Sequence, residues 1–82
     1  MPYIAQNLRQ SVELPGIWHE TAGELNYVIT RLCLRYIENN GEQYKHYNDV
    51  IGALECCKLE MYRRAVAPYE DLKIKQNGDV YV

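Results

Sequence analysis

The fold is decided by the last third of the chain, residues 48 to 82, where the sequence runs NDVIGALECCKLEMYRRAVAPYEDLKIKQNGDVYV. Apolar residues recur at helical spacing in its first half, and Pro68 then interrupts the pattern. Because the residue before a proline avoids the helical region, we expect the helix to end near Val66. The sequence therefore predicts a helix over about 49–66, with Asn48 or Asp49 as its N-cap.

A second structural signal follows the proline. The runs Leu72–Ile74 and Val80–Val82 both alternate apolar and polar residues, and Asn77-Gly78 lies between them. This dipeptide between alternating runs is the strongest short hairpin signal. We therefore predict a C-terminal β-hairpin with strands at about 72–75 and 79–82, which must pack on helices or on another chain because a lone hairpin is marginally stable.

Two further helices are predicted before this region. Ile4, Leu8 and Val12 are spaced four residues apart and indicate a short helix over about 4–14, which Pro15-Gly16 would end. The second helix is expected over about 22–39. Its N-terminus carries the capping-box pattern Thr21-Ala22-Gly23-Glu24, and Gly41 lies just after its end. The expected fold is mainly α: three helices and a small hairpin in a single domain, residues 1–82.

Composition narrows the class of protein. The chain has 82 residues, a formal net charge of −2, and no apolar run of the roughly 20 residues that a membrane span needs. A net negative charge argues against binding to duplex nucleic acid. The three cysteines are an odd number, and the N-terminus lacks the basic and apolar regions of a signal peptide. We therefore expect a cytoplasmic protein with free thiols.

The amount of apolar sequence predicts self-association. A chain of this length buries only about 60–65% of its unfolded surface, so its core is marginal. The helix over 49–66 has more apolar positions than three short elements can cover, and a second subunit would bury the excess. We expect a homo-oligomer, with an interface that includes Tyr36, Leu59, Met61 and Ile74.

Arginines and tyrosines cluster around the proline. Tyr62, Arg63, Arg64 and Tyr69 could bind an anion that carries a ring, such as a nucleotide, because guanidinium groups match phosphate oxygens and tyrosine offers a stacking face. Helix-surface ion pairs are the alternative, since Glu60 precedes the two arginines by three and four residues.

Two other basic regions are weaker candidates for the same ligand. Lys45 and Tyr47 lie in a polar, aromatic segment, residues 42–47, that we expect to be a loop; a solvated loop explains it equally well. On the second helix, Arg31 and Arg35 are one turn apart and repel mildly. This hints at an anionic partner, unless Arg35 pairs with Glu38.

Catalytic and metal signatures are not evident. Cys33, Cys56, Cys57, His19 and His46 are the only soft-metal ligands, and zinc sites favour Cys-x₂₋₄-Cys spacing, whereas Cys56 and Cys57 are adjacent. Buried cysteines that act as small apolar residues are the simpler interpretation. We therefore expect no metal, no cofactor and no enzymatic activity.

The chain resembles a family of short prokaryotic and phage proteins, a domain of unknown function. The segments that carry the resemblance are GELNYVIT at 23–30, NDVIGALEC at 48–56, YRRAVAPYED at 62–71 and NGDVY at 77–81. They span nearly the whole chain and depart most between residues 6 and 22. The resemblance implies a stand-alone domain, often phage-encoded and then acting in the bacterial host cytoplasm, and it implies no activity.

Two functions follow as hypotheses. The first is a non-enzymatic homo-oligomeric protein that captures an anionic, nucleotide-like ligand at a subunit interface, with anti-defence sequestration of a host signal as its sharpest form. The second is a structural or interaction module that binds a host protein through its apolar helix face and its C-terminal hairpin. Calorimetry against nucleotides would separate the two.

Overall fold

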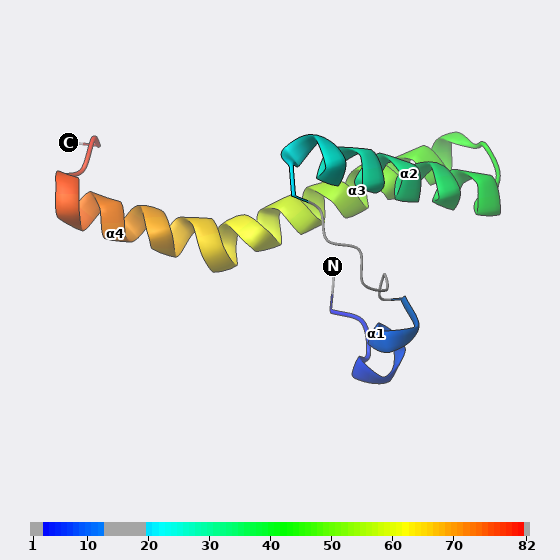
Figure 1. Ribbon diagram of the computed structural model, residues 1–82, viewed down its shortest axis with the longest axis horizontal. Helices are drawn as coiled ribbons and strands as arrows, with labels where there is room; N and C mark the ends of the chain where they lie inside the picture. The colour runs from blue at the N-terminus through cyan, green and yellow to red at the C-terminus, as the bar shows by residue number, and fades with distance from the viewer. Residues whose placement is uncertain (1–2, 13–19, 82) are drawn as a thin grey trace. The chain divides into compact units, whose positions relative to one another are not determined.

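The computed structural model describes residues 3–12 and 20–81. Contacts divide the chain into two units, one within residues 3–52 and the other within residues 53–81 of the described chain. Each unit is described by itself. Figure 1 shows the element order α1, α2, α3 and α4, and a π-helical segment, η1, lies between α3 and α4.

Helix α1 covers Gln6–Val12, within the predicted range of 4–14. Its entry is fixed by local hydrogen bonds, since the Leu8 amide donates to the Ala5 carbonyl and Arg9 Nε donates to the Ile4 carbonyl at 3.0 Å. The predicted end of this helix at Pro15-Gly16 lies outside the described residues.

Helix α2 covers Ala22–Asn40 and confirms the prediction to within one residue. Thr21 is extended and its hydroxyl accepts from the Glu24 amide at 3.1 Å, as a capping box requires. The Glu24 carboxylate accepts from the Glu20 amide at 2.9 Å, one residue earlier than expected. The helix ends at Gly41, whose φ of +98° favours glycine and whose amide donates to the Ile37 carbonyl.

Helix α3 covers Tyr44–Met61 and begins five residues earlier than its predicted start at 49. The loop expected at 42–47 is therefore wrong for Tyr44–Tyr47. The Gln43 carbonyl accepts from the amides of His46 and Tyr47, so the first turn closes before Asn48. His46 Nδ1 also lies 2.7 Å from the Gly41 carbonyl oxygen and holds this turn against the end of α2.

The predicted helix end near Val66 is wrong, because the backbone continues through the π-helix η1, Tyr62–Val66, into α4, Ala67–Asn77. Pro68 has no amide hydrogen, and its ring clashes with the carbonyl four residues earlier in an α-helix. In the π-helical turn the Ala67 amide bonds to the Tyr62 carbonyl, five residues back, and Pro68 occupies the first turn of α4, where proline is tolerated.

The predicted β-hairpin is also wrong. Residues 72–77 belong to α4, and residues 79–81 form no strand; Val82 lies outside the described residues. Gly78 has a φ of +91° and its amide donates to the Ile74 carbonyl at 2.8 Å, so Asn77-Gly78 ends a helix instead of turning a hairpin. Both contexts favour glycine at a positive φ, which is why the dipeptide was misleading.

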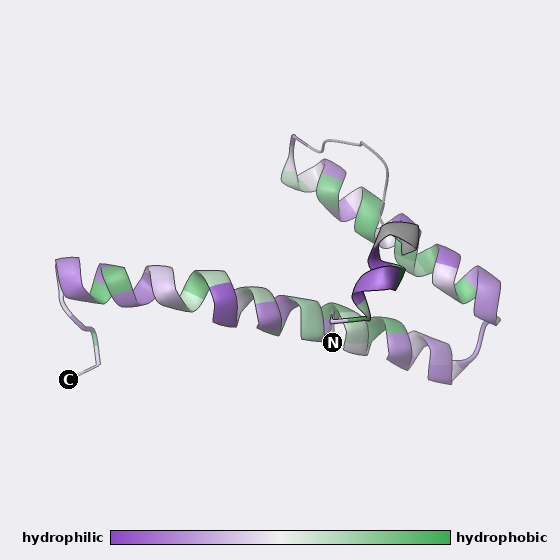
Figure 2. Ribbon diagram, turned by 90° about the horizontal axis from the view of Figure 1, so that it is seen from below, coloured by the Kyte–Doolittle hydropathy of each residue, from purple (hydrophilic) through white to green (hydrophobic). Residues whose placement is uncertain are grey.

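Apolar side chains remain open to solvent in both units. No residue whose side chain the structure describes is buried, and large apolar residues are exposed along α2, α3, η1 and α4. In Figure 2 apolar turns recur along α2 and along the helical segment from α3 to α4. Within the described residues, no helix combines the length and the apolar character that crossing a membrane requires.

Candidate functional site

The basic-aromatic corner consists of Tyr62, Arg63, Arg64 and Tyr69, on η1 and the first turns of α4. Arg63 forms an ion pair with Glu60, as the alternative interpretation predicted. The Lys73 ammonium lies 5.5 Å from the centre of the Tyr69 ring, at the distance of a cation–π contact. Arg64 is exposed and forms no ion pair among the described residues. Arg64 is therefore the arginine of this corner that is available to bind an anion.

Tyr62 is tied to a carboxylate. Its hydrogen bond to Glu70 is the largest cause that raises the pKa of Tyr62 above its ordinary value of 10.0. The charge of Glu70, partial desolvation and the charges of Asp71 and Tyr81 act in the same direction. Each of these favours the neutral phenol, so Tyr62 is held as a hydrogen-bond donor.

Lys45 and Tyr47 lie on the first turn of α3 instead of in a loop, and both belong to the unit within residues 3–52. Partial desolvation is the main cause that raises the pKa of Tyr47, followed by the charge of Glu42 and a hydrogen bond to it. The other four predicted ligand residues lie in the second unit. The six predicted ligand residues are thus divided between the two units.

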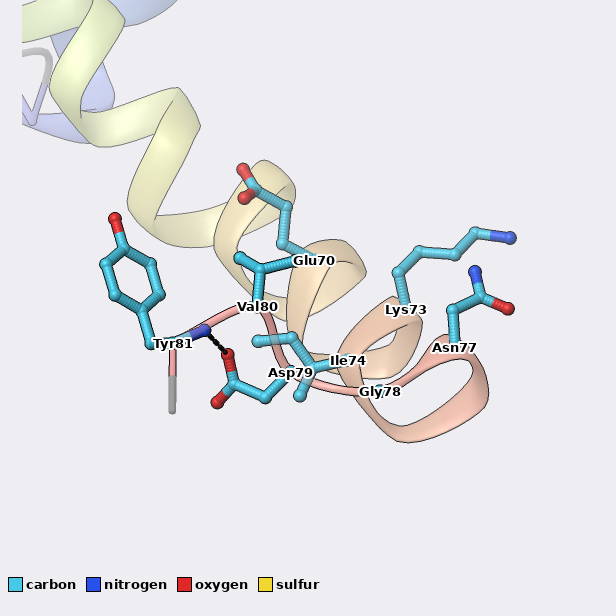
Figure 3. A pocket seen from close by; sticks show the side chains of 8 residues that line it. All are labelled: Glu70, Lys73, Ile74, Asn77, Gly78, Asp79, Val80 and Tyr81. Carbon is cyan, nitrogen blue, oxygen red and sulfur yellow. Dashed lines mark hydrogen bonds between the residues drawn. The ribbon is translucent and has the colours of Figure 1, made fainter.

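A hollow of about 290 Å³ lies at the C-terminal end of α4 (Figure 3). The segment after Gly78 turns back beside the helix, and the Tyr81 amide donates to Asp79 Oδ1 at 2.9 Å. Two carboxylates and one ammonium group carry its charge, so its rim does not favour a phosphate. The lining residues are Glu70, Lys73, Ile74, Asn77, Gly78, Asp79, Val80 and Tyr81.

Sequence reasoning missed this hollow because it assigned the segment to a hairpin. One signal for it was present. Glu70, Lys73, Ile74 and Asn77 are spaced i, i+3, i+4 and i+7, which places them on one helix face. Glu70 belongs to both sites, since it lines the hollow and accepts from Tyr62.

The turn between α2 and α3 carries a separate polar cluster. The Tyr36 hydroxyl donates to Asp49 Oδ2 at 3.1 Å, and this bond is the main cause that raises the pKa of Tyr36. The His46 ring meets the Tyr36 ring edge-on, with centroids 6.3 Å apart. These contacts join α2 to α3. The Arg35–Glu38 ion pair considered above does not form, and neither Arg31 nor Arg35 has an ionic partner in the described chain.

The remaining predicted site residues are placed as follows. The four expected interface residues, Tyr36, Leu59, Met61 and Ile74, are all exposed. The expectation of buried cysteines is wrong for Cys56 and Cys57, which are exposed, whereas Cys33 is half-buried. In the part of the chain that the structure describes, no three His, Cys, Asp or Glu side chains gather as a metal site would require. His19 lies outside that part.

The described residues define a small, mainly helical protein whose apolar helix faces are open to solvent. Residues 1–80 match a domain of unknown function, DUF6899. The chain belongs to this family, which agrees with the resemblance to an uncharacterised domain family. No curated protein and no solved structure matches the chain.

Proposed function

We propose that this protein is a non-enzymatic binding protein that acts as a homo-oligomer. The observation that carries the proposal is the absence of any buried side chain among those the structure describes, although large apolar residues recur along α2 to α4. An 82-residue domain normally buries most of the surface that its unfolded chain exposes, and apolar faces of this kind mark interaction sites. Association of copies would supply the missing core.

The oligomer would bind an anionic, nucleotide-like ligand at the basic-aromatic corner. Arg64 is exposed and has no ionic partner among the described residues, and tyrosine rings lie on the same segment. Copies that meet near η1 would bring several such guanidinium groups around one phosphate, which a monomer does not do. The sharpest form, sequestration of a host signal by a phage-encoded protein in a reducing cytoplasm, is supported by the sequence resemblance and the free thiols alone.

Light scattering and calorimetry test the two halves of this proposal separately. We expect a molar mass that is a multiple of 9.6 kDa at micromolar concentration. Calorimetry against a panel of linear and cyclic nucleotides should detect at least one ligand. Arg64→Gln should weaken it about 10- to 100-fold, as the loss of a charge-assisted hydrogen bond predicts.

The control variant is Lys58→Gln. Lys58 is an exposed cation on α3 that already pairs with Glu55 at 3.1 Å, so its loss should change affinity little. A monomeric mass at every concentration would overturn the homo-oligomer. If no nucleotide in the panel bound, the nucleotide-binding function would be excluded and the second candidate function would remain.

The second candidate is a protein-interaction module that uses the apolar helix faces. The same exposed residues favour it, but the hairpin that was to add to a partner sheet is not present among the described residues. Its partner would therefore dock on a helix face, by the helix-in-groove mode.

A further inference from the structure

The α2 stripe is the set of apolar residues Leu25, Ile29, Leu32 and Tyr36, spaced four, three and four residues apart on one face of α2. They remain 50%, 37%, 39% and 40% exposed although α3 is joined to the same helix at its C-terminal end. An apolar face of this width at helical spacing normally packs against another helix. Nothing in the described chain covers it fully.

The opposite face of α2 is polar, which restricts docking to one side. Helical spacing places Tyr27, Arg31 and Glu38 there, while Glu24 and Arg35 lie at the edge of the stripe, about 90–110° from its centre. Leu34 also lies on that side, two residues and therefore about 200° from Leu32. One helix thus offers an apolar stripe and, on its far side, a leucine that serves as a matched control.

The stripe can be desolvated without leaving a polar group unpaired. Its one polar atom is the Tyr36 hydroxyl, which already donates to Asp49 Oδ2 at 3.1 Å. An unpaired buried hydroxyl would oppose docking, because desolvation without a hydrogen bond is costly. The tyrosine ring contacts the His46 ring at one edge and is still 40% exposed, so its open part can enter an interface while its hydroxyl keeps its partner.

The spacing of the stripe is symmetric about the point between residues 30 and 31. An antiparallel copy of α2 would therefore place Leu25 opposite Tyr36 of the second copy, and Ile29 opposite Leu32 of the second copy. Such a self-complementary patch is what a two-fold interface requires. A parallel copy would instead place each residue opposite itself.

Charge favours the antiparallel arrangement. Glu24 is in the first turn of α2 and Arg35 is near its end, and both flank the same side of the stripe. In antiparallel packing, Glu24 of one copy approaches Arg35 of the other, and Arg35 has no other ionic partner in the described chain. In parallel packing the two Arg35 side chains would lie on opposite sides of the interface and Glu24 would not reach Arg35, and the two helix dipoles would also oppose association.

We propose that a second copy of this chain docks on the α2 stripe, with the two α2 helices antiparallel. The inference rests on the self-association proposed above and adds a contact through α2, with a stated orientation, to the contact near η1. Each copy contributes the same four side chains, so the interface is complete only in the dimer.

Disulfide trapping tests the orientation. Leu25→Cys and Tyr36→Cys are made separately in a chain where Cys33, Cys56 and Cys57 are serine. We expect an oxidised mixture of the two variants to form cross-linked dimers, while each variant alone does not. In the antiparallel pair, residue 25 lies eleven residues, about 16 Å, from its own equivalent, which is beyond disulfide reach.

A second measurement does not depend on those variants. Leu32→Asp should raise the dissociation constant by about 100-fold or more, because both copies lose an apolar contact, whereas Leu34→Asp should change it less than about threefold. Analytical ultracentrifugation gives both values, and circular dichroism checks that each variant remains helical.

The outcomes separate this inference from the proposed function. Cross-linking of Leu25→Cys with itself would show a parallel pair and overturn the orientation. Oligomers that survive Leu32→Asp and give no trapped dimer would place the interface elsewhere, and the homo-oligomer would stand. A monomer under every condition would overturn both the homo-oligomer and the α2 contact. The α2 stripe would then have to bind a different protein.

Discussion

At the scale of single residues, one carboxylate raises the pKa of Tyr62 and another raises the pKa of Tyr36. Glu70 accepts from Tyr62 and Asp49 accepts from Tyr36, and in both cases this hydrogen bond is the main reason that the tyrosine pKa is raised. The two pairs lie in different units, so each can be changed while the other serves as its reference. The effect of one carboxylate can thus be measured at one ring.

We expect Glu70→Gln to lower the pKa of Tyr62 toward its ordinary value of 10.0, because the amide neither carries a charge nor accepts as strongly. The pKa of Tyr36 should stay raised, since Asp49 is unchanged. NMR titration of the tyrosine ring carbons measures both. An unchanged Tyr62 titration in Glu70→Gln would contradict the contact.

The raised pKa values of Tyr36 and Tyr62 predict how the stability of the folded state changes with pH. A phenol whose pKa is higher in the folded state holds its proton more tightly there, so its contribution to stability is fully present below pH 10. That contribution is lost as the pH rises through the folded pKa of Tyr36 and Tyr62. We expect the urea midpoint to fall in this range, and to fall less in a Tyr36→Phe, Tyr62→Phe double variant.

At the scale of elements, glycines with a positive φ end both long helical segments. Gly41 closes α2 and Gly78 closes α4, whereas Gly52 lies inside α3 with open space where a Cβ would be. Substitution by alanine at Gly41 or Gly78 tests the effect of backbone strain on stability. The same substitution at Gly52 tests the effect of helix propensity.

We expect Gly78→Ala to lower the free energy of unfolding by about 1 kcal/mol, because an alanine at positive φ is strained. Gly52→Ala should raise it by about 0.5–1 kcal/mol, since alanine loses less backbone entropy in a helix. Urea denaturation followed by circular dichroism gives both values. Equal effects of the two substitutions would contradict the assignment of Gly78 to a helix end.

Pro68 is the residue that sets the π-helical turn. Pro68→Ala restores an amide that can donate to the Arg64 carbonyl, so we expect η1 to become α-helical and the free energy of unfolding to rise by about 0.5–1.5 kcal/mol, the net contribution of one regained hydrogen bond. Hydrogen exchange at residue 68 and backbone chemical shifts over 62–67 would report the change. Retention of the π-helical bond from Ala67 to Tyr62 would show that the proline does not cause it.

Local sequence signals predicted a helix or strand correctly where each signal is typical of only one kind of structure. Thr21, Glu24 and Gly41 placed α2 to within one residue, because caps act through nearest neighbours. Asn77-Gly78 failed, since a hairpin and a helix end both accept glycine at a positive φ. At the site, Glu60 was recognised as the partner of Arg63, but the Tyr62–Glu70 bond depends on the helix continuing past Pro68.

At the scale of the whole molecule, the described side chains do not form a buried core. Helix α2 is capped at both ends and α4 ends at Gly78, so local hydrogen bonds define these helix ends. A helix is marginal in water without tertiary packing of its apolar face. Stability of this protein should therefore depend on how much of that face is covered, and hence on concentration.

We expect the thermal midpoint to rise with protein concentration, because association stabilises the folded chain by mass action. A tenfold increase should raise it by about 3–5 °C for a dimer of this size. Leu32→Asp should abolish the dependence, and Leu34→Asp should retain it. Scanning calorimetry under reducing conditions measures the midpoint without disulfides at Cys56 or Cys57. A midpoint independent of concentration would mean that each chain is stable alone, and the open helix faces would then need a different partner.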